Sequence, residues 1–290
     1  MHSLIQELTA RGPIVTDGAW GTELQARGLG SGDFPDAWNL THPERVEEVA
    51  RAYVAAGSQI ILTNTFGANR LRLSGHAMAD RVTEMNRAGV EISWRAAGGW
   101  ARVFASVGPS GKLLMTGETT EDELSAVFAE QASALAQAGA DAIVVETMAD
   151  LAEAQLAVAA VRATGLPVVA CMVFDSGKDK DRTMMGATPE QVAEALTTAG
   201  ADVIGANCGQ GIAGFAAIGK RLRAATDRPI WLKPNAGLPQ FVDGRAIYAT
   251  TPEQFVAHVP ELIKAGASFI GGCCGSSPAF IQAIVRGLRN

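Results

Sequence analysis

Short apolar runs recur along the whole chain, and each is flanked by segments with the polar and apolar spacing of amphipathic helices. Four of these runs belong to an internal repeat, in which a glycine ends a helical segment and a β-branched run soon follows. The copies are AAGSQIILTNT, QAGADAIVVET, TAGADVIGANC and KAGASFIGGCC, with the glycines Gly57, Gly139, Gly200 and Gly266. Each copy predicts a helix, a glycine cap and a buried strand.

Four further apolar runs lie between these copies, at residues 14–16, 103–107, 168–174 and 230–232. Sequences typical of helix starts separate these runs. Two of them combine a capping hydroxyl, a first-turn proline and an amide that can complete a capping box: Thr188-Pro189-Glu190-Gln191 and Thr251-Pro252-Glu253-Gln254. A similar start is His42-Pro43-Glu44. Eight buried strands alternating with helices predict parallel pairing with right-handed crossovers.

At 290 residues, this alternation favours a closed (β/α)8 barrel over an open doubly wound sheet. Residues 28–38 and 175–182 read as irregular surface segments. No linker or compositional break divides the sequence, so we expect one barrel domain over residues 1–290.

Composition and charge narrow the classes of function. Nearly half of the residues are apolar, which suits a large core, and the net charge of -6 without a basic run argues against nucleic acid and anionic membranes as partners. The first residues lack the apolar core of a signal peptide, and no apolar run is long enough to span a bilayer, so we expect a cytoplasmic protein. In that compartment, four cysteines point to metal binding or catalysis before disulfides.

Polar residues follow every predicted strand. In such barrels the carboxyl ends of the strands carry the catalytic residues. The strand ends in chain order are Asp17-Gly18, Thr63-Asn64-Thr65, Gly108-Pro109-Ser110-Gly111, Glu146-Thr147, Asp175, Asn207-Cys208-Gly209, Asn235-Ala236-Gly237 and Cys273-Cys274-Gly275. The ordinary polarity of loops explains the serines and glycines. It does not explain Glu146, an acid directly after the apolar run AIVV, or three cysteines at the ends of two strands.

The three cysteines at strand ends, Cys208, Cys273 and Cys274, would meet on the axis of a barrel. Zinc favours thiolates, and a catalytic zinc has three protein ligands and an open fourth position. Adjacent cysteines on a regular strand point to opposite faces, so the pair can share a metal only if the strand breaks, and we expect Gly271, Gly272 and Gly275 to supply that freedom. From spacing alone, buried core thiols are the alternative. Cys171, inside VVACMVF, is interpreted as a core thiol.

The succession DGAWGTELQ, TNTFGAN, GPSG, VVETM, GATPEQ, GANCGQG, KPNAGLP and GGCCGSSP resembles the homocysteine S-methyltransferase family, in particular the homocysteine-binding barrel of cobalamin-dependent methionine synthases. The resemblance runs from Asp17 to Pro278. It implies that Cys208, Cys273 and Cys274 ligate zinc and that the reaction moves a methyl group to the thiol of homocysteine, forming methionine.

The same resemblance implies roles for residues around the metal. Asp17 and Glu146 would receive the homocysteine ammonium, with Thr65 also in the substrate site, and backbone N–H groups from Gly18 to Gly21 would lie near the carboxylate. The side-chain oxygen of Asn235 would occupy the fourth zinc position until the substrate thiol displaces it. The alternatives are that Asp17 caps a βα turn, that Asn235 makes a local turn and that Glu146 pairs with an arginine.

The methyl donor is open. Because the sequence ends after the barrel motifs, we expect a methyl-corrinoid or methylfolate donor to be presented by a partner protein. Gly67 follows Phe66 where betaine-dependent relatives have an aromatic residue, which disfavours betaine, while S-methylmethionine-type relatives have a similar length. Two other classes of function stay open. One is a corrinoid-linked methyltransferase that acts on another compound, and the other is a non-catalytic zinc-binding subunit, although a structural zinc site of that kind would have four ligands.

Overall fold

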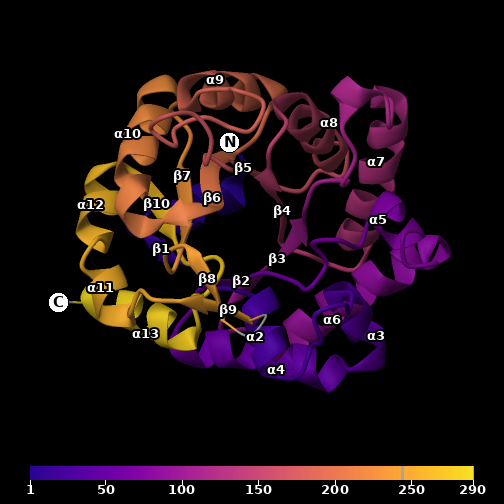
Figure 1. The fold of residues 1–290 in the computed structure, drawn as a ribbon, viewed down its shortest axis with the longest axis horizontal. Helices are drawn as coiled ribbons and strands as arrows, with labels where there is room; N and C mark the ends of the chain where they lie inside the picture. Colours follow the sequence, from indigo (N-terminus) through magenta and orange to yellow (C-terminus); the bar gives the residue numbers. More distant parts are fainter. Residues whose placement is uncertain (243–244, 290) are drawn as a thin grey trace.

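Eight parallel strands form a ring with helices on its outside (Figure 1). The computed structural model describes residues 1–242 and 245–289. The strands of the ring are β1 (Ile14–Val15), β2 (Ile60–Ile61), β3 (Arg102–Val107), β4 (Ala142–Met148), β5 (Val168–Met172), β6 (Val203–Gly211), β7 (Ile230–Asn235) and β10 (Ala267–Ile270). They pair in the order β1-β10-β7-β6-β5-β4-β3-β2. This confirms the predicted (β/α)8 barrel.

The helices connect the strands as the sequence predicts. They are α1 (Ser3–Thr9), α2 (Gly21–Ala26), α3 (Trp38–Thr41), α4 (Pro43–Ala56), α5 (Arg70–Ser74), α6 (Val82–Ala97), α7 (Glu121–Gln137), α8 (Leu151–Arg162), α9 (Pro189–Ala199), α10 (Phe215–Ala225), α11 (Pro252–Val256), α12 (Val259–Lys264) and α13 (Pro278–Gly287). Thr188 and Thr251 form the two predicted capping boxes. Gly57 and Gly200 end α4 and α9 in the left-handed region, each at φ 98°.

The barrel closes where β1 meets β2, and a side-chain amide and a carboxylate help to close it. The Gln59 backbone N–H donates to the Val15 carbonyl at 2.8 Å, and the Gln59 side-chain oxygen accepts from the Val15 N–H at 3.0 Å. Farther along both strands, the Asp17 carboxylate accepts from the Leu62 N–H at 2.7 Å. Asp17 therefore takes part in closing the barrel.

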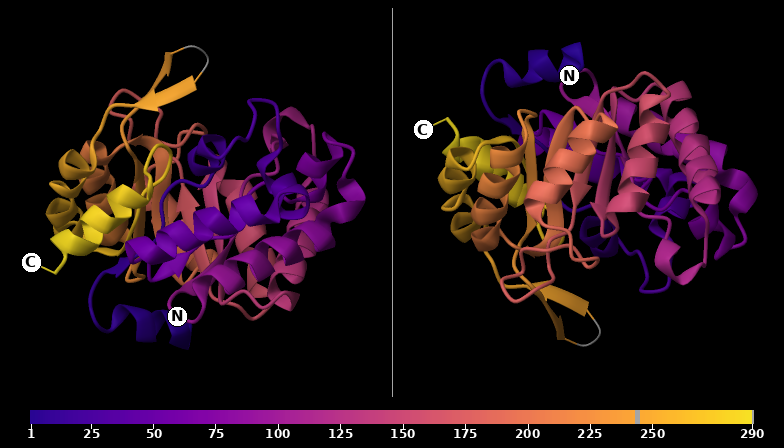
Figure 2. Two further views of the ribbon diagram at one scale, coloured as in Figure 1. Left: turned by 90° about the horizontal axis from the view of Figure 1, so that it is seen from below. Right: turned by 90° about the horizontal axis from the view of Figure 1, so that it is seen from above.

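Apolar side chains fill the interior of the barrel below its mouth. Phe104, Trp231 and Phe269 stack across the axis, with ring centroids 6.2 Å and 5.2 Å apart. Cys171 belongs to this inner cluster and is 1% exposed, as its apolar run predicts. Ile5 of α1 packs into the same cluster, so α1 covers one end of the barrel (Figure 2).

An antiparallel hairpin, β8 (Pro239–Val242) and β9 (Arg245–Tyr248), projects from the opposite end of the barrel (Figure 2). The hydrophobic pattern of the sequence did not predict this hairpin. Of the two irregular segments that were predicted, residues 175–182 turn back on themselves through a bridge between Ser176 and Arg182, and residues 28–38 contain a short 3-10 turn. In the part of the chain that the structure describes, no helix is both long and apolar enough to cross a bilayer.

Candidate metal and substrate site

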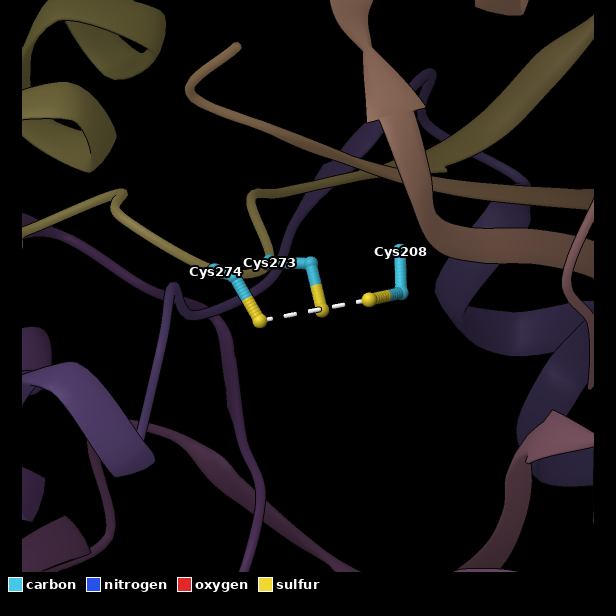
Figure 3. Close-up of side chains that lie close together, drawn as sticks. All are labelled: Cys208, Cys273 and Cys274. Atoms are coloured by element: carbon cyan, nitrogen blue, oxygen red, sulfur yellow. Dashed lines mark hydrogen bonds between the residues drawn. The ribbon is translucent and has the colours of Figure 1, made fainter. Parts of the chain in front are cut away.

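Three cysteine sulfurs lie next to one another at the carboxyl ends of two strands (Figure 3). Cys208 comes from β6, and Cys273 and Cys274 follow β10. The three Sγ atoms lie within 4.8 Å of one another, and those of Cys208 and Cys274 are 3.9 Å apart. In a tetrahedral site with Zn–S bonds of about 2.3 Å the sulfurs are roughly 3.8 Å apart. The spacing of the thiols therefore suits zinc.

Local backbone geometry turns Cys208 toward the axis. Its φ of 61° lies in the left-handed region, which costs a non-glycine residue roughly 1–2 kcal/mol. The next residue, Gly209, is also left-handed at φ 73°, and a Cβ there would lie 2.8 Å from a Val173 methyl carbon. These two left-handed residues lie within β6, where its register with β7 shifts between Asn207 and Gly211, and this irregularity sets the position of the thiol.

The cysteine pair lies on a break after β10, but two of the three glycines there act differently from expected. The prediction that Gly271 and Gly272 supply conformational freedom was wrong, because neither has a positive φ. A Cβ on Gly271 would lie 2.1 Å from Thr16 Oγ1, and one on Gly272 would lie 2.1 Å from Ser276 Oγ, so both glycines permit close approach instead. Gly275, at φ 80°, does supply the left-handed turn.

Hydrogen bonds to β7 and to the next turn hold the pair in place. The Cys273 N–H donates to the Pro234 carbonyl at 2.8 Å, and the Ala236 N–H donates to the Cys274 carbonyl at 2.9 Å. The Ser276 hydroxyl donates to the Cys273 carbonyl at 2.6 Å. Both thiols are thereby kept on the same side of the chain.

Asn235, at the end of β7, has a buried oxygen with no hydrogen-bond partner in the described part of the chain. Such an atom is normally paired, so an unpaired carbonyl-type oxygen beside three thiols suits a metal. The thiols of Cys273 and Cys274 lower the pKa of Cys208, and the Asn235 side chain acts in the same direction. The donor set fits a zinc ion.

A cavity of about 390 Å³ opens beside the sulfurs. Its walls come from the ends of β1, β2, β3, β4, β6, β7 and β10 and from the loops that follow. The lining residues are Gly18, Ala19, Trp20, Gly21, Thr22, Phe34, Pro35, Asp36, Leu62, Thr63, Asn64, Phe66, Gly67, Arg72, Ser106, Glu146, Thr147, Cys208, Lys233, Cys273 and Cys274. Such a volume lies in the range that small-molecule ligands occupy, roughly 300–1,000 Å³.

Glu146 presents a carboxylate to this cavity. It is 8% exposed, accepts a hydrogen bond from Ser106 Oγ at 2.5 Å and a longer one from Asn207 Nδ2 at 3.3 Å. Burial raises its pKa, while Lys233 acts in the opposite direction. In the described chain no arginine contacts Glu146, so the alternative of an arginine pair does not apply.

Asp17 and Thr65 lie beneath the cavity and are not among its lining residues. Asp17 is fully buried: Oδ1 accepts from Lys233 Nζ at 2.5 Å, and Oδ2 accepts from Trp20 Nε1 and the Leu62 N–H, both at 2.7 Å. Thr65 Oγ1 donates to the Ser106 carbonyl at 2.7 Å. Both residues therefore contact cavity-lining residues.

Gly18 does line the cavity, and its lack of a side chain is required there. A Cβ would lie 2.4 Å from the Ser276 carbonyl oxygen. In the same loop, the Ala19 N–H donates to that oxygen at 2.9 Å, so one of the amides expected for the substrate carboxylate is used within the protein. The amides of Gly18, Trp20 and Gly21 have no backbone acceptor recorded in the described chain.

Two residues of the site were not assigned roles from the sequence. Lys233 lines the cavity and is 2% exposed. The sequence marks it only as a single charged residue after the apolar run IWL. Asn207 joins the ends of β4 and β6, since its side chain pairs with both the N–H and the hydroxyl of Thr147 at 2.8 and 2.7 Å.

Fold and site together define a barrel protein with a three-thiol metal-binding site beside a cavity for a small ligand. The sequence profile of the homocysteine S-methyltransferase family matches residues 14–288, and the chain belongs to this family. That confirms the predicted family, whose reaction transfers a methyl group to the sulfur of homocysteine.

Individual relatives agree with this assignment. The chain is 32% identical over 296 residues to a methionine synthase of Mycobacterium tuberculosis, with 96% of this chain and 25% of the relative covered. A methionine synthase of Mycobacterium leprae is 30% identical over 294 residues, with 96% and 24% covered. The chain thus spans about a quarter of the length of these relatives. The metallated homocysteine methyltransferase MmuM from Escherichia coli shares the fold, with a TM-score of 0.81, 24% identity and complete coverage of both chains.

Proposed function

We propose that this chain methylates the thiol of homocysteine to form methionine, at a zinc ion held by Cys208, Cys273 and Cys274. The observation that supports this most is the convergence of the three sulfurs beside a cavity that also holds the buried acid Glu146. Three ligands suit a catalytic zinc better than a structural one, which has four.

When bound, zinc lowers the pKa of a coordinated thiol and keeps it as the thiolate, which is the nucleophilic form. We propose that Asn235, whose Oδ1 has no hydrogen-bond partner among the described residues, would help to hold the metal when no substrate is present. The remaining residues orient the amino acid. Glu146 accepts hydrogen bonds from the ammonium, and the amides of Gly18, Trp20 and Gly21 donate to the carboxylate.

Asp17 and Thr65 act from beneath the cavity in this proposal. Asp17 positions Lys233 through their ion pair. Thr65 bonds the carbonyl of Ser106, whose hydroxyl in turn orients Glu146. Both residues therefore affect homocysteine through a neighbour that faces it.

For the donor, we propose a methylated corrinoid presented by a partner protein, with a folate carrier as the second choice. The likeness to proteins named methionine synthase supports this. The environment of Gly67 argues against a betaine site formed by an aromatic residue at that position. A Cβ on Gly67 would lie 3.0 Å from the Phe34 ring and 3.1 Å from an Asp36 oxygen, so a larger side chain there would require Phe34 and Asp36 to move.

The test combines metal analysis with an assay for methionine. Purified protein is incubated with zinc and homocysteine, and separately with methylcobalamin, S-methylmethionine, betaine and methyltetrahydrofolate. We expect one zinc per chain and the fastest methionine formation from methylcobalamin among these donors. Cys208→Ser, Cys273→Ser and Cys274→Ser should each lose zinc and activity, while Cys171→Ser should retain zinc. Full zinc occupancy in all three site variants would refute the metal assignment, and turnover fastest with betaine would refute the donor assignment.

A further inference from the structure

Lys233 is a buried cation whose hydrogen-bonding capacity is only partly used. It follows the apolar residues of β7 and is 2% exposed, yet it lines the cavity. Its Nζ donates to Asp17 Oδ1 at 2.5 Å, the only acceptor recorded for it in the described chain. An ammonium group has three N–H donors, and leaving buried donors unpaired is costly. An acceptor in the cavity would complete its hydrogen bonds.

Asp17 holds this lysine firmly. The second oxygen of Asp17 is bonded by Trp20 Nε1 and the Leu62 N–H, so the carboxylate is fixed by two elements of the barrel. The Lys233 ammonium and the Asp17 carboxylate form a buried ion pair, with the two side chains 2% and 0% exposed. Lys233 is therefore a positioned positive charge in the wall of the cavity.

The cavity thus offers an acidic and a basic side chain from two different strands of the barrel. Glu146 comes from β4, and Lys233 comes from β7. A zwitterionic amino acid needs one partner for each of its charged groups. The loop amides near Gly18 are neutral donors and do not supply the positive charge that a carboxylate pairs with most strongly.

We propose that Lys233 binds the α-carboxylate of the amino-acid acceptor, with Asp17 as the counter-ion that positions it. The proposal rests on the proposed function, since it names a contact for homocysteine in that site. It also assigns Asp17 a partner of its own chain in place of the substrate ammonium.

The experiment measures binding by calorimetry to zinc-loaded protein with three ligands. Homocysteine carries both charged groups, 3-aminopropane-1-thiol lacks the carboxylate, and 4-mercaptobutanoate lacks the ammonium. The variants are Lys233→Met and Glu146→Gln, with Lys220→Met on the exposed face of α10 as the matched control. Lys233→Met removes the positive partner of the buried Asp17 carboxylate. The double variant Asp17→Asn with Lys233→Met is therefore measured as well, and zinc content is determined for every variant.

We expect Lys233→Met and the double variant to weaken the binding of homocysteine and of 4-mercaptobutanoate by roughly 10- to 150-fold. This is the scale of a hydrogen bond to a charged group. Binding of 3-aminopropane-1-thiol should change by no more than about twofold. Glu146→Gln should show the reverse selectivity, and Lys220→Met should change nothing.

Two results would overturn the proposal while leaving the proposed function intact. One is an equal loss for all three ligands in the double variant, which is the pattern of a structural role. The other is unchanged binding of 4-mercaptobutanoate in both Lys233 variants. If zinc-loaded wild-type protein binds none of the three thiols, the proposed function itself fails, and the Lys233 assignment fails with it.

Discussion

Replacing Asn207 by leucine tests how the two halves of the site are joined. The Asn207 side chain is 1% exposed and lies between the ends of β4 and β6. Its oxygen accepts from the Thr147 N–H at 2.8 Å, and its amide nitrogen donates to Thr147 Oγ1 at 2.7 Å and to Glu146 Oε2 at 3.3 Å. Thr147 has a left-handed φ of 60°, so these bonds hold an unfavourable backbone conformation in place, and Cys208, the residue after Asn207, is also left-handed at 61°.

The expected loss follows from these contacts. Leucine has a similar volume, so packing changes little, but two short hydrogen bonds disappear at about 0.5–1.5 kcal/mol each. The Thr147 N–H also loses its partner, which adds about 1–3 kcal/mol. We therefore expect the free energy of unfolding to fall by roughly 2–6 kcal/mol and, because Glu146 loses a donor, the homocysteine Kd to rise roughly tenfold.

Urea unfolding and calorimetry measure these two quantities, with Thr147→Val as a partial perturbation that removes only the hydroxyl contact. That variant should lose about 0.5–1.5 kcal/mol. If Asn207→Leu unfolds at the wild-type urea concentration and binds homocysteine normally, the link between β4 and β6 has been misjudged.

Three further predictions concern other buried groups. Burial raises the pKa of Asp36 from 3.8 to about 7, so its neutral form favours folding at low pH and this contribution is lost as pH rises from about 4 to about 7. Asp36→Asn should flatten that part of the pH dependence of the unfolding free energy by up to about 4 kcal/mol, and an unchanged pH dependence would contradict this. Glu146→Gln should raise the homocysteine KM roughly 10- to 150-fold with zinc content unchanged, and a wild-type KM would exclude the ammonium contact. Cys171→Ala should cost about 1 kcal/mol of stability and retain one zinc per chain; loss of the metal would show that this thiol is not merely a core side chain.

The fold was predictable because its signals are local. Gly57 and Gly200 end their helices through their own left-handed conformation, and the capping boxes at Thr188 and Thr251 require only four residues each. The convergence of Cys208 with the Cys273 pair followed from topology, since the carboxyl ends of parallel barrel strands meet at one mouth. Neither inference needs knowledge of side-chain packing.

The contacts that the sequence did not reveal are long-range. Lys233 and Asp17 are 216 residues apart, and their pairing exists only because β7 and β1 both lie beside β10. The sequence shows Lys233 as a lone charge after an apolar run, which does not name its partner. Gly271 was misjudged for the same reason, because the atoms that exclude a side chain there belong to Thr16 and Asp17.

X-ray absorption at the zinc edge tests the central claim most directly. The protein is loaded with one equivalent of zinc under reducing conditions, and spectra are recorded with and without homocysteine. We predict three sulfur ligands at about 2.3 Å and one lighter atom in the substrate-free protein, and four sulfur ligands after homocysteine is added. A coordination shell that is the same with and without homocysteine would contradict the account of a metal site that binds the acceptor thiol.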